Sequence, residues 1–238
     1  MQSELTPAFI LHHRPYRETS LLVEIFASRE GRIAAIAKGA NRPRSPMRGL
    51  LQPFRPLLAA WTGRCEIATL TRVEADGPQL PLTGRKLLSA FYLSELIMRV
   101  LHRHDAHPKL FLQYQASLKQ LSVAEGEEPV LRIFEKKLLD EIGYGLVLDH
   151  SVDSGAPIDA GQDYFFQRDK GPWHIAPEVI PTIKVRGRTL IALAREEVHG
   201  PEVLQEAKQL MRFVLKPHFG DKPLMSRQLF MNSREHSG

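Results

Sequence analysis

The sequence lacks most of the features that mark familiar classes of protein. Its 238 residues include one cysteine, Cys65, which excludes an intrachain disulfide and any zinc site built from several cysteines. No run of about 18 uninterrupted apolar residues is present, so we expect no membrane span. The first residues carry neither a basic segment nor an apolar core, and no signal peptide is predicted. Together these absences favour a protein of a reducing cytoplasm.

Motifs of common enzyme chemistries are missing as well. The chain has no GxxxxGK[ST], GxGxxG, HExxH or GxSxG pattern. The nearest approach is the run from His102 to His107, which is similar to the HxHxDH metal-ligand pattern of binuclear hydrolases. In that pattern the acid would stand at Ala106, whereas here it is Asp105. We therefore expect no catalytic residue, no cofactor and no metal, with a metal-dependent nuclease that uses this run as an alternative.

Acidic residues are absent from one long stretch. Residues 31–65 contain seven Lys or Arg and no Asp or Glu, and residues 1–80 hold 11 basic against 7 acidic side chains. Such clustering indicates a polyanionic partner, because each neutralised phosphate releases condensed counterions. Gly and Pro in residues 37–49 predict a loop without a helix. Four basic residues lie in this loop: Lys38, Arg42, Arg44 and Arg48.

Residues 8–76 have the pattern of a small β domain. Apolar or alternating runs separated by turn signals predict five strands, at 8–13, 20–27, 32–37, 50–61 and 66–74. Five short strands without a helix among them indicate a closed barrel, for which the five-stranded OB-fold is the usual solution at this size. Uneven spacing of Ile67, Leu70 and Val73 predicts a bulge in the last strand.

From about residue 82 the pattern becomes helical. Apolar residues between Leu93 and Leu101 recur at helical spacing, and further helices are predicted at about 108–121, at 129–142 with Pro129 in its first position, and from Pro201. Residues 144–187 are rich in Gly, Pro and Asp and predict an irregular or hairpin-like segment. The fold class is therefore α+β, with a barrel followed by a mainly helical domain.

Several collinear motifs carry a resemblance to one family. They are Ala8–Leu22, Gly31-Arg-Ile, Ala37–Ala40, Leu51–Phe54, Leu131–Glu135, Ile142–Gly145, Leu215–Pro217 and Ser226–Phe230. In these motifs the chain resembles the bacterial recombination mediators of the RecO family, and most of all their gamma-proteobacterial members.

The resemblance implies a particular organisation and function. It implies an OB-fold in residues 1–80 and a helical domain in 81–238, with an insert near 144–187 that here lacks the cysteines of the family's zinc site. It further implies a nucleoid-associated, non-enzymatic protein that binds single- and double-stranded DNA and anneals strands. The implied partners are RecR, the C-terminal tail of the single-stranded DNA-binding protein (SSB) and, indirectly, RecA. An RNA-binding OB-fold protein of translation or ribosome assembly is the alternative.

Two sets of site residues follow. OB-folds combine a basic groove with aromatic platforms, and the expected DNA-binding residues are Lys38, Arg42, Arg44, Arg48, Arg14, Arg17, Tyr16 and Arg32. The SSB tail implied by the resemblance is acidic and ends in an apolar side chain beside a free carboxylate, so its receptor needs an apolar pocket with a cation at the rim. The residues expected there are Arg132, Lys136, Arg99, Leu131 and Phe134.

Overall fold

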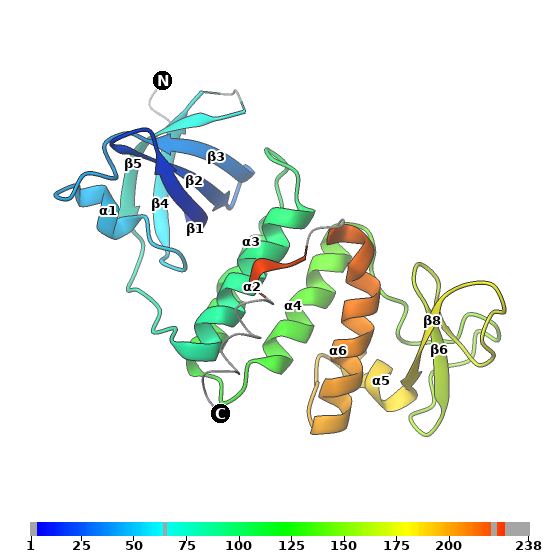
Figure 1. Ribbon diagram of the computed structural model, residues 1–238. Coiled ribbons are helices and arrows are strands. Elements are labelled where there is room, and N and C mark those ends of the chain that lie inside the picture. The colour runs from blue at the N-terminus through cyan, green and yellow to red at the C-terminus, as the bar shows by residue number, and fades with distance from the viewer. Residues whose placement is uncertain (1–3, 64–65, 220–222, 227–238) are drawn as a thin grey trace. The chain divides into compact units, whose positions relative to one another are not determined.

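The computed structural model describes residues 4–63, 66–219 and 223–226, which form two compact units (Figure 1). Of the described residues, the first unit contains those up to Val123 together with Leu224–Ser226. The second contains Ala124–Pro223. This division follows spatial contact between residues, and the boundary expected at residues 80–81 stays a prediction.

Five strands of the first unit close into a barrel. They are β1 (Thr6–Tyr16), β2 (Ser20–Ala27), β3 (Gly31–Ala37), β4 (Leu57–Thr62) and β5 (Ala68–Ala75). Their order around the barrel is β1-β2-β3-β5-β4, and β4 returns to β1. Among the named strands of the barrel in the described residues, β3 and β5 pair in parallel and the other neighbours are antiparallel. The five-stranded OB-type barrel expected from the sequence is confirmed.

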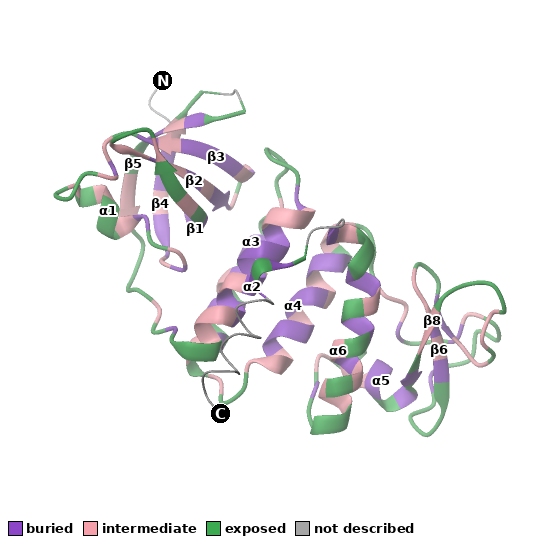
Figure 2. Ribbon diagram, viewed as in Figure 1, coloured by how far each residue is buried: buried purple, intermediate pink, exposed green. Residues whose placement is uncertain are grey.

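Alternation along the strands fills the barrel with small and branched side chains. Val23, Ile25, Ile33 and Leu57 point inward and are almost completely buried. Burying one such side chain contributes about 1.5–3 kcal/mol relative to leaving it exposed. In Figure 2 the strands β3 and β4 therefore appear largely purple, whereas the second half of β1 and most of β5 do not.

Two bulges adjust the register of the barrel. Between Ala60 and Trp61 the pairing of β4 with β5 skips Thr71, which places an extra residue in the last strand as predicted. A second bulge, which the sequence did not indicate, inserts Leu11 into β1 between the pairs formed by Ile10 and His12. Because side chains alternate with a period of two, one inserted residue reverses which later positions face outward.

The segment between β3 and β4 corrects two predictions. A short helix, α1 (Pro46–Leu50), occupies part of the loop that was expected to contain none. Pro46 is compatible with it because the first helical position needs no N–H donor. The fourth strand was expected from residue 50 and starts only at Leu57, because Pro53 and Pro56 cannot donate to a strand ladder.

Two helices pack against the barrel within the first unit. They are α2 (Gly84–Val100) and α3 (Pro108–Val123), which agree with the predicted helical segments. Aromatic rings form the contact: Phe9 and Phe26, on the outer face of the barrel, lie 5.4–6.0 Å from the rings of Phe111 and Tyr114. This part of the barrel face is therefore closed to any partner.

The segment from Leu224 to Ser226 also belongs to the first unit. The carboxylate of Glu95, on α2, accepts hydrogen bonds from the backbone N–H groups of Met225 and Ser226 and from the Ser226 hydroxyl, at 2.6–2.9 Å. Arg99, one turn further along α2, lies 3.5 Å from the same carboxylate. A mostly buried glutamate thus holds the returning chain.

The second unit combines helices with a small sheet. Its elements are α4 (Glu128–Glu141), β6 (Asp163–Gln167), β7 (Gly171–Trp173), β8 (Thr182–Arg186), α5 (Gly187–Arg195), α6 (Pro201–Leu215) and the 3-10 helix η1 (Lys216–Phe219). The antiparallel sheet, in the order β7-β6-β8, confirms the hairpin-like segment, and α4 and α6 confirm predicted helices. Helix α5 was not predicted.

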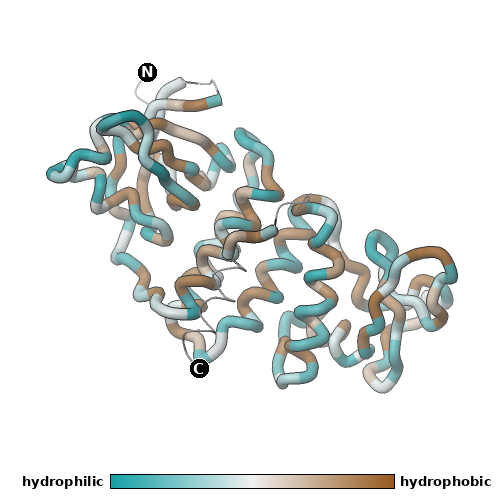
Figure 3. Tube along the Cα trace, viewed as in Figure 1, coloured by the Kyte–Doolittle hydropathy of each residue, from teal (hydrophilic) through white to brown (hydrophobic). Residues whose placement is uncertain are grey.

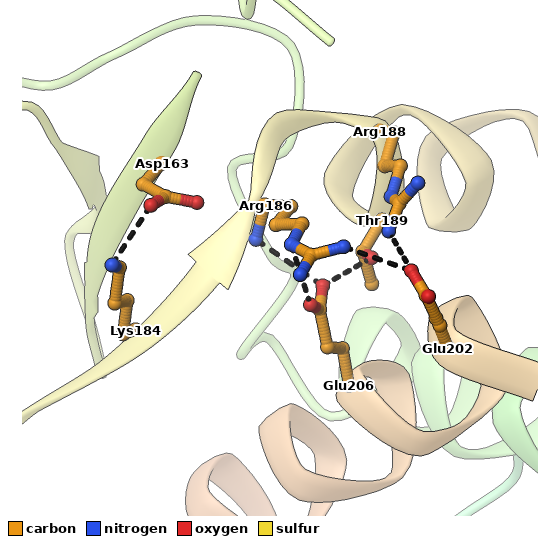
Figure 4. Close-up of polar contacts among 7 residues, drawn as sticks. All are labelled: Asp163, Lys184, Arg186, Arg188, Thr189, Glu202 and Glu206. Atoms are coloured by element: carbon orange, nitrogen blue, oxygen red, sulfur yellow. Dashed lines mark hydrogen bonds and ion pairs between the residues drawn. The ribbon is translucent and has the colours of Figure 1, made fainter. Parts of the chain in front are cut away.

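Ion pairs connect the sheet of this unit to its helices. Arg186, at the end of β8, contacts both Glu202 and Glu206 of α6, and Thr189 of α5 donates to Glu206 at 2.6 Å (Figure 4). Arg188 contacts Glu202 as well. These contacts fix α5 between β8 and α6. Among the helices of the described residues, none is long and apolar enough to cross a membrane.

Candidate nucleic-acid interface

The outer side of β1, β2 and β3 away from α3 is an open face of the barrel. On β1 the bulge at Leu11 turns His12, Arg14 and Tyr16 outward. Arg14 pairs across the ladder with Leu22, which in turn pairs with Ile36 of β3. Leu22 and Ile36 are half-buried, whereas Phe9 and Phe26 on the covered part are fully buried. Polar and apolar groups therefore share a solvent-accessible sheet surface.

Two loops border this open face at the same end of the barrel. The backbone N–H of Asn41, in the loop after β3, donates to the carbonyl of Thr19, in the turn between β1 and β2, at 2.9 Å. This bond brings the loop of Lys38–Ser45 beside the turn that carries Arg17. Arg17 has a positive φ of 53° and its guanidinium lies 5.4 Å from the centre of the Tyr16 ring, within the range of a cation–π contact.

The loop cations are exposed and carry no internal counter-charge. Lys38, Arg42, Arg44 and Arg48 are all exposed, and within the described part of the chain none of them pairs with a carboxylate. Other barrel arginines differ, because Arg29 pairs with Glu4 and Arg72 with Glu74. Figure 3 shows the loop leading into α1 in the teal of hydrophilic residues. An unpaired cation in solvent is free to contact phosphate.

The paired histidines of β1 point to opposite faces, as strand geometry requires. His12 is exposed on the open face opposite Glu24, and His13 is half-buried opposite Val23. Burial lowers the pKa of His13, and the neighbouring His12 lowers it further. His13 therefore contributes no charge to the face at neutral pH, and Arg14 and the loops provide its cations.

Arg32 does not lie on the open face. Its guanidinium contacts Glu24 at 3.2 Å and donates to the backbone carbonyls of Met98 and Leu101, at the end of α2. These bonds use the charge to join barrel and helix, which argues against a DNA contact at Arg32. Arg55 is also engaged, through the carbonyl of Gly49 at 3.2 Å. Arg64 lies outside the described residues.

The residues expected to form the SSB-tail pocket are not arranged as a pocket. Leu131 and Phe134 are buried in the core of the second unit, and Arg132 is only 3% exposed. The Arg132 guanidinium lies 3.0 Å from Glu135 and 3.8 Å from Glu128. Sequence periodicity missed this burial, although acids three and four residues away from Arg132 were a visible signal.

The remaining two cations of that set also have partners. Lys136 lies 3.0 Å from Glu196, and burial of this glutamate is outweighed by its lysine partners, so its pKa is lowered. Arg99 lies in the first unit beside Glu95. The structure therefore gives no support to a tail receptor centred on α4.

No group of three or more His, Cys, Asp or Glu side chains with the geometry of a metal site occurs within the described ranges. In the run from His102 to His107, His107 lies 3.4 Å from Asp105, and His102 and His104 are exposed. In the insert, His174 bonds to Asp153 at 3.0 Å through its ring. Cys65 lies outside the described residues. The absence of zinc stays a prediction for elemental analysis.

Comparison with known proteins gives matches over both units. The family described as Recombination protein O N terminal matches residues 1–78, and the one described as Recombination protein O C terminal matches residues 81–228. Proteins named DNA repair protein RecO from Nitrosococcus oceani, Nitrosospira multiformis and Haemophilus influenzae are 49%, 47% and 44% identical to this chain. The matches cover 98%, 96% and 97% of this chain and 95%, 95% and 97% of those relatives, in the same order.

Proposed function

The chain belongs to the RecO family, and from this premise we propose that it is a DNA-binding mediator of recombinational repair that makes and breaks no covalent bond. The observation that carries the proposal is the open barrel face beside the unpaired cations Lys38, Arg42, Arg44 and Arg48. We further propose that it works in the cytoplasm, associated with the nucleoid.

Binding on this face combines two kinds of contact. The loop cations neutralise phosphates, which supplies affinity that is independent of sequence and sensitive to salt. Tyr16 offers a ring on which a base can stack, an interaction worth about 1–3 kcal/mol per base, and Arg17 helps to hold that ring. Neither contact reads the edges of the bases. Bound strands would keep their pairing edges free, as the annealing of complementary strands requires.

The phosphate contacts can be tested by the salt dependence of binding. Replacing Lys38, Arg42, Arg44 and Arg48 by Ala should weaken binding of a fluorescent oligothymidylate. The slope of log affinity against log salt should become shallower by about 0.7 for each lost contact with a single strand. The matched control replaces Arg29 and Arg72, which are paired with barrel carboxylates. A folded quadruple variant with an unchanged slope would contradict the proposed interface.

For the SSB tail we propose a different receptor within the second unit. A cavity of about 290 Å³ lies between the end of α4, the β6–β7 hairpin and the end of α6. Leu139, Phe166 and Val214 supply apolar walls, and the ring of Tyr144 lies 4.5 Å from that of His218 at its border. Burial lowers the pKa of His218, and nearby Asp169, which also lines the cavity, offsets this only in part, so His218 stays largely uncharged at neutral pH.

Cations lie at the rim of this cavity. Arg168 donates to the carbonyl of Phe213 and lies 4.4 Å from the centre of that ring, so its partners are neutral. Lys170 is exposed beside it. An apolar wall with a basic rim fits an apolar residue next to a terminal carboxylate. Lys170→Glu should abolish binding of a tail peptide, and Lys184→Glu, on the exposed side of β8, is the control. Equal binding by both variants would exclude this cavity.

We also propose association with RecR and indirect help in loading RecA, which the family membership supports. The alternative is an RNA-binding OB-fold protein, because phosphate and stacking contacts do not by themselves separate the two nucleic acids. Annealing of complementary DNA strands in the presence of structured RNA competitors distinguishes these functions. Efficient competition by RNA without annealing of DNA would favour the alternative.

A further inference from the structure

The loop between α2 and α3 docks on the barrel edge that β5 leaves free. Strand β5 pairs with β3 only at Ala35 and Ile36. At the start of β3, Arg32 instead forms a parallel bridge with Arg103, and the backbone N–H of His104 donates to the carbonyl of Arg32 at 2.9 Å. Residues 102–104 therefore extend the sheet beyond the strands of the barrel.

This docking places Arg103 at the border of the open face, next to Glu24 of β2. Its guanidinium lies 2.5 Å from one oxygen of Glu24, and Arg32 lies 3.2 Å from the other. Glu24 stands directly opposite His12 in the β1–β2 ladder. Arg103 is thus adjacent to the row of outward-facing residues on β1, and its side chain is 36% exposed.

One carboxylate between two guanidiniums leaves a net positive charge at this place. Arg32 also donates to two backbone carbonyls, those of Met98 and Leu101. Arg103 donates to the carboxylate of Glu24. A phosphate arriving on the open face would meet Arg103 held in position. Arginine binds phosphate with a planar pair of donors, the same geometry with which it binds a carboxylate.

We infer that the strand-binding track continues from Tyr16 through Arg14 and His12 to Arg103, with Glu24 as an internal competitor that a phosphate displaces. The inference rests on the proposed function and extends its site into the loop between α2 and α3. Outward side chains two residues apart on a strand are spaced by about 6.8 Å, so Tyr16 to His12 covers roughly 14 Å. Lys109, exposed in the first turn of α3, is the next Lys or Arg along the chain after Arg103, and we expect it to continue the track.

Glu24→Gln provides a gain-of-binding test. The substitution removes the competing charge and frees Arg103, while Arg32 keeps its carbonyl acceptors. Affinity for an oligothymidylate of about 16 nucleotides should rise about two- to fivefold, the range that one surface ion pair supports. The salt slope should steepen by about 0.7, as expected for one added contact with a single strand.

A double-mutant cycle shows whether Arg103 is responsible. With Ala at position 103, Glu24→Gln should no longer steepen the slope, and most of its gain should vanish. An equal gain with and without Arg103 would overturn the inference, because Glu24 would then act only through the charge it removes. Thermal unfolding of each variant checks that the loop stays docked.

A second pair of variants does not depend on the Glu24 contact. Lys109→Glu in the first turn of α3 should weaken binding, whereas Lys119→Glu, roughly 15 Å further along the same helix, should not. If both bind as the wild type does while the quadruple loop variant is weakened, the track ends before Lys109, and its continuation past Arg103 fails while the proposed function stands. If the wild-type protein does not bind the oligothymidylate at all, the proposed function fails with it.

Discussion

Gly31, at the first position of β3, is the point where the barrel tolerates no side chain. Its φ is +69°, and an added Cβ would lie 1.7 Å from the carbonyl oxygen of Asp105. Gly39, in the cationic loop, is the matched control. Its φ is +72°, but the nearest atom to an added Cβ is Nε of Arg42 at 3.9 Å. The two glycines thus share a backbone conformation and differ in the space around them.

The expected loss of stability can be worked out from these contacts. An L residue in the left-handed region costs about 1–2 kcal/mol, which is the whole expected effect of Gly39→Ala. Gly31→Ala must in addition move the loop that carries Asp105. That movement breaks the His104–Arg32 backbone bond, worth about 0.5–1.5 kcal/mol. It also weakens the pairing of Arg103, worth about 0.2–1 kcal/mol, so Gly31→Ala should cost about 2–4 kcal/mol in all.

Urea denaturation followed by tryptophan fluorescence measures this difference. Trp61 reports on the barrel, and a Trp173→Phe background removes the signal of the second unit. The barrel transition of Gly31→Ala should occur at a lower urea concentration than that of Gly39→Ala. Equal midpoints for the two variants would refute the close docking of the loop, and with it the placement of Arg103 on the track.

Three further predictions concern other parts of the molecule. Glu95→Ala leaves the two N–H donors at Met225 and Ser226 without their acceptor and should lower the free energy of unfolding by about 2–4 kcal/mol in urea; a loss below that of Ser226→Ala would contradict the role of Glu95. Burial raises the pKa of Asp153, but hydrogen bonds from His174 outweigh this and lower it. The resulting stability is present above the unfolded-state pKa and is lost as pH falls through the lower folded-state value. Asp153→Asn should therefore flatten the fall in urea midpoint that occurs below the ordinary titration range of aspartate. Arg132→Glu places a third carboxylate beside the two that hold this side chain and should cost about 3–5 kcal/mol in thermal unfolding, and a variant of wild-type stability would disprove its burial.

Much of the fold could be predicted because local patterns and tertiary structure agree. The barrel strands alternate, and Pro129 and Pro201 stand in the first turns of α4 and α6. Helix α1 escaped prediction because its five residues are too short for any periodic signal. Helix α5 has only nine residues and directly follows β8, so it too gives a short periodic signal.

The candidate site was predictable in its composition but not in its geometry. Exposure of Lys38 and Arg42 follows from a polar loop with no acid nearby. The outward direction of Arg14 and Tyr16 depends on the bulge at Leu11, which arises from closing the barrel and leaves no mark in the strand's own sequence. The position of Leu22 on the open face was not predicted for the same reason. An apolar residue in a strand is expected in the core until the register of that strand is known.

The hydrogen bonds that Glu95 accepts from Met225 and Ser226 have a consequence for folding during synthesis on the ribosome. Glu95 and Ser226 are 131 positions apart, so the first unit cannot be completed until the whole second unit has been translated. At about 5–20 residues per second, this wait lasts roughly 7–26 seconds. During that interval Arg99, four residues away on α2, can supply Glu95 with a counter-charge. Folding of the first unit is therefore completed only after the second unit has been synthesised.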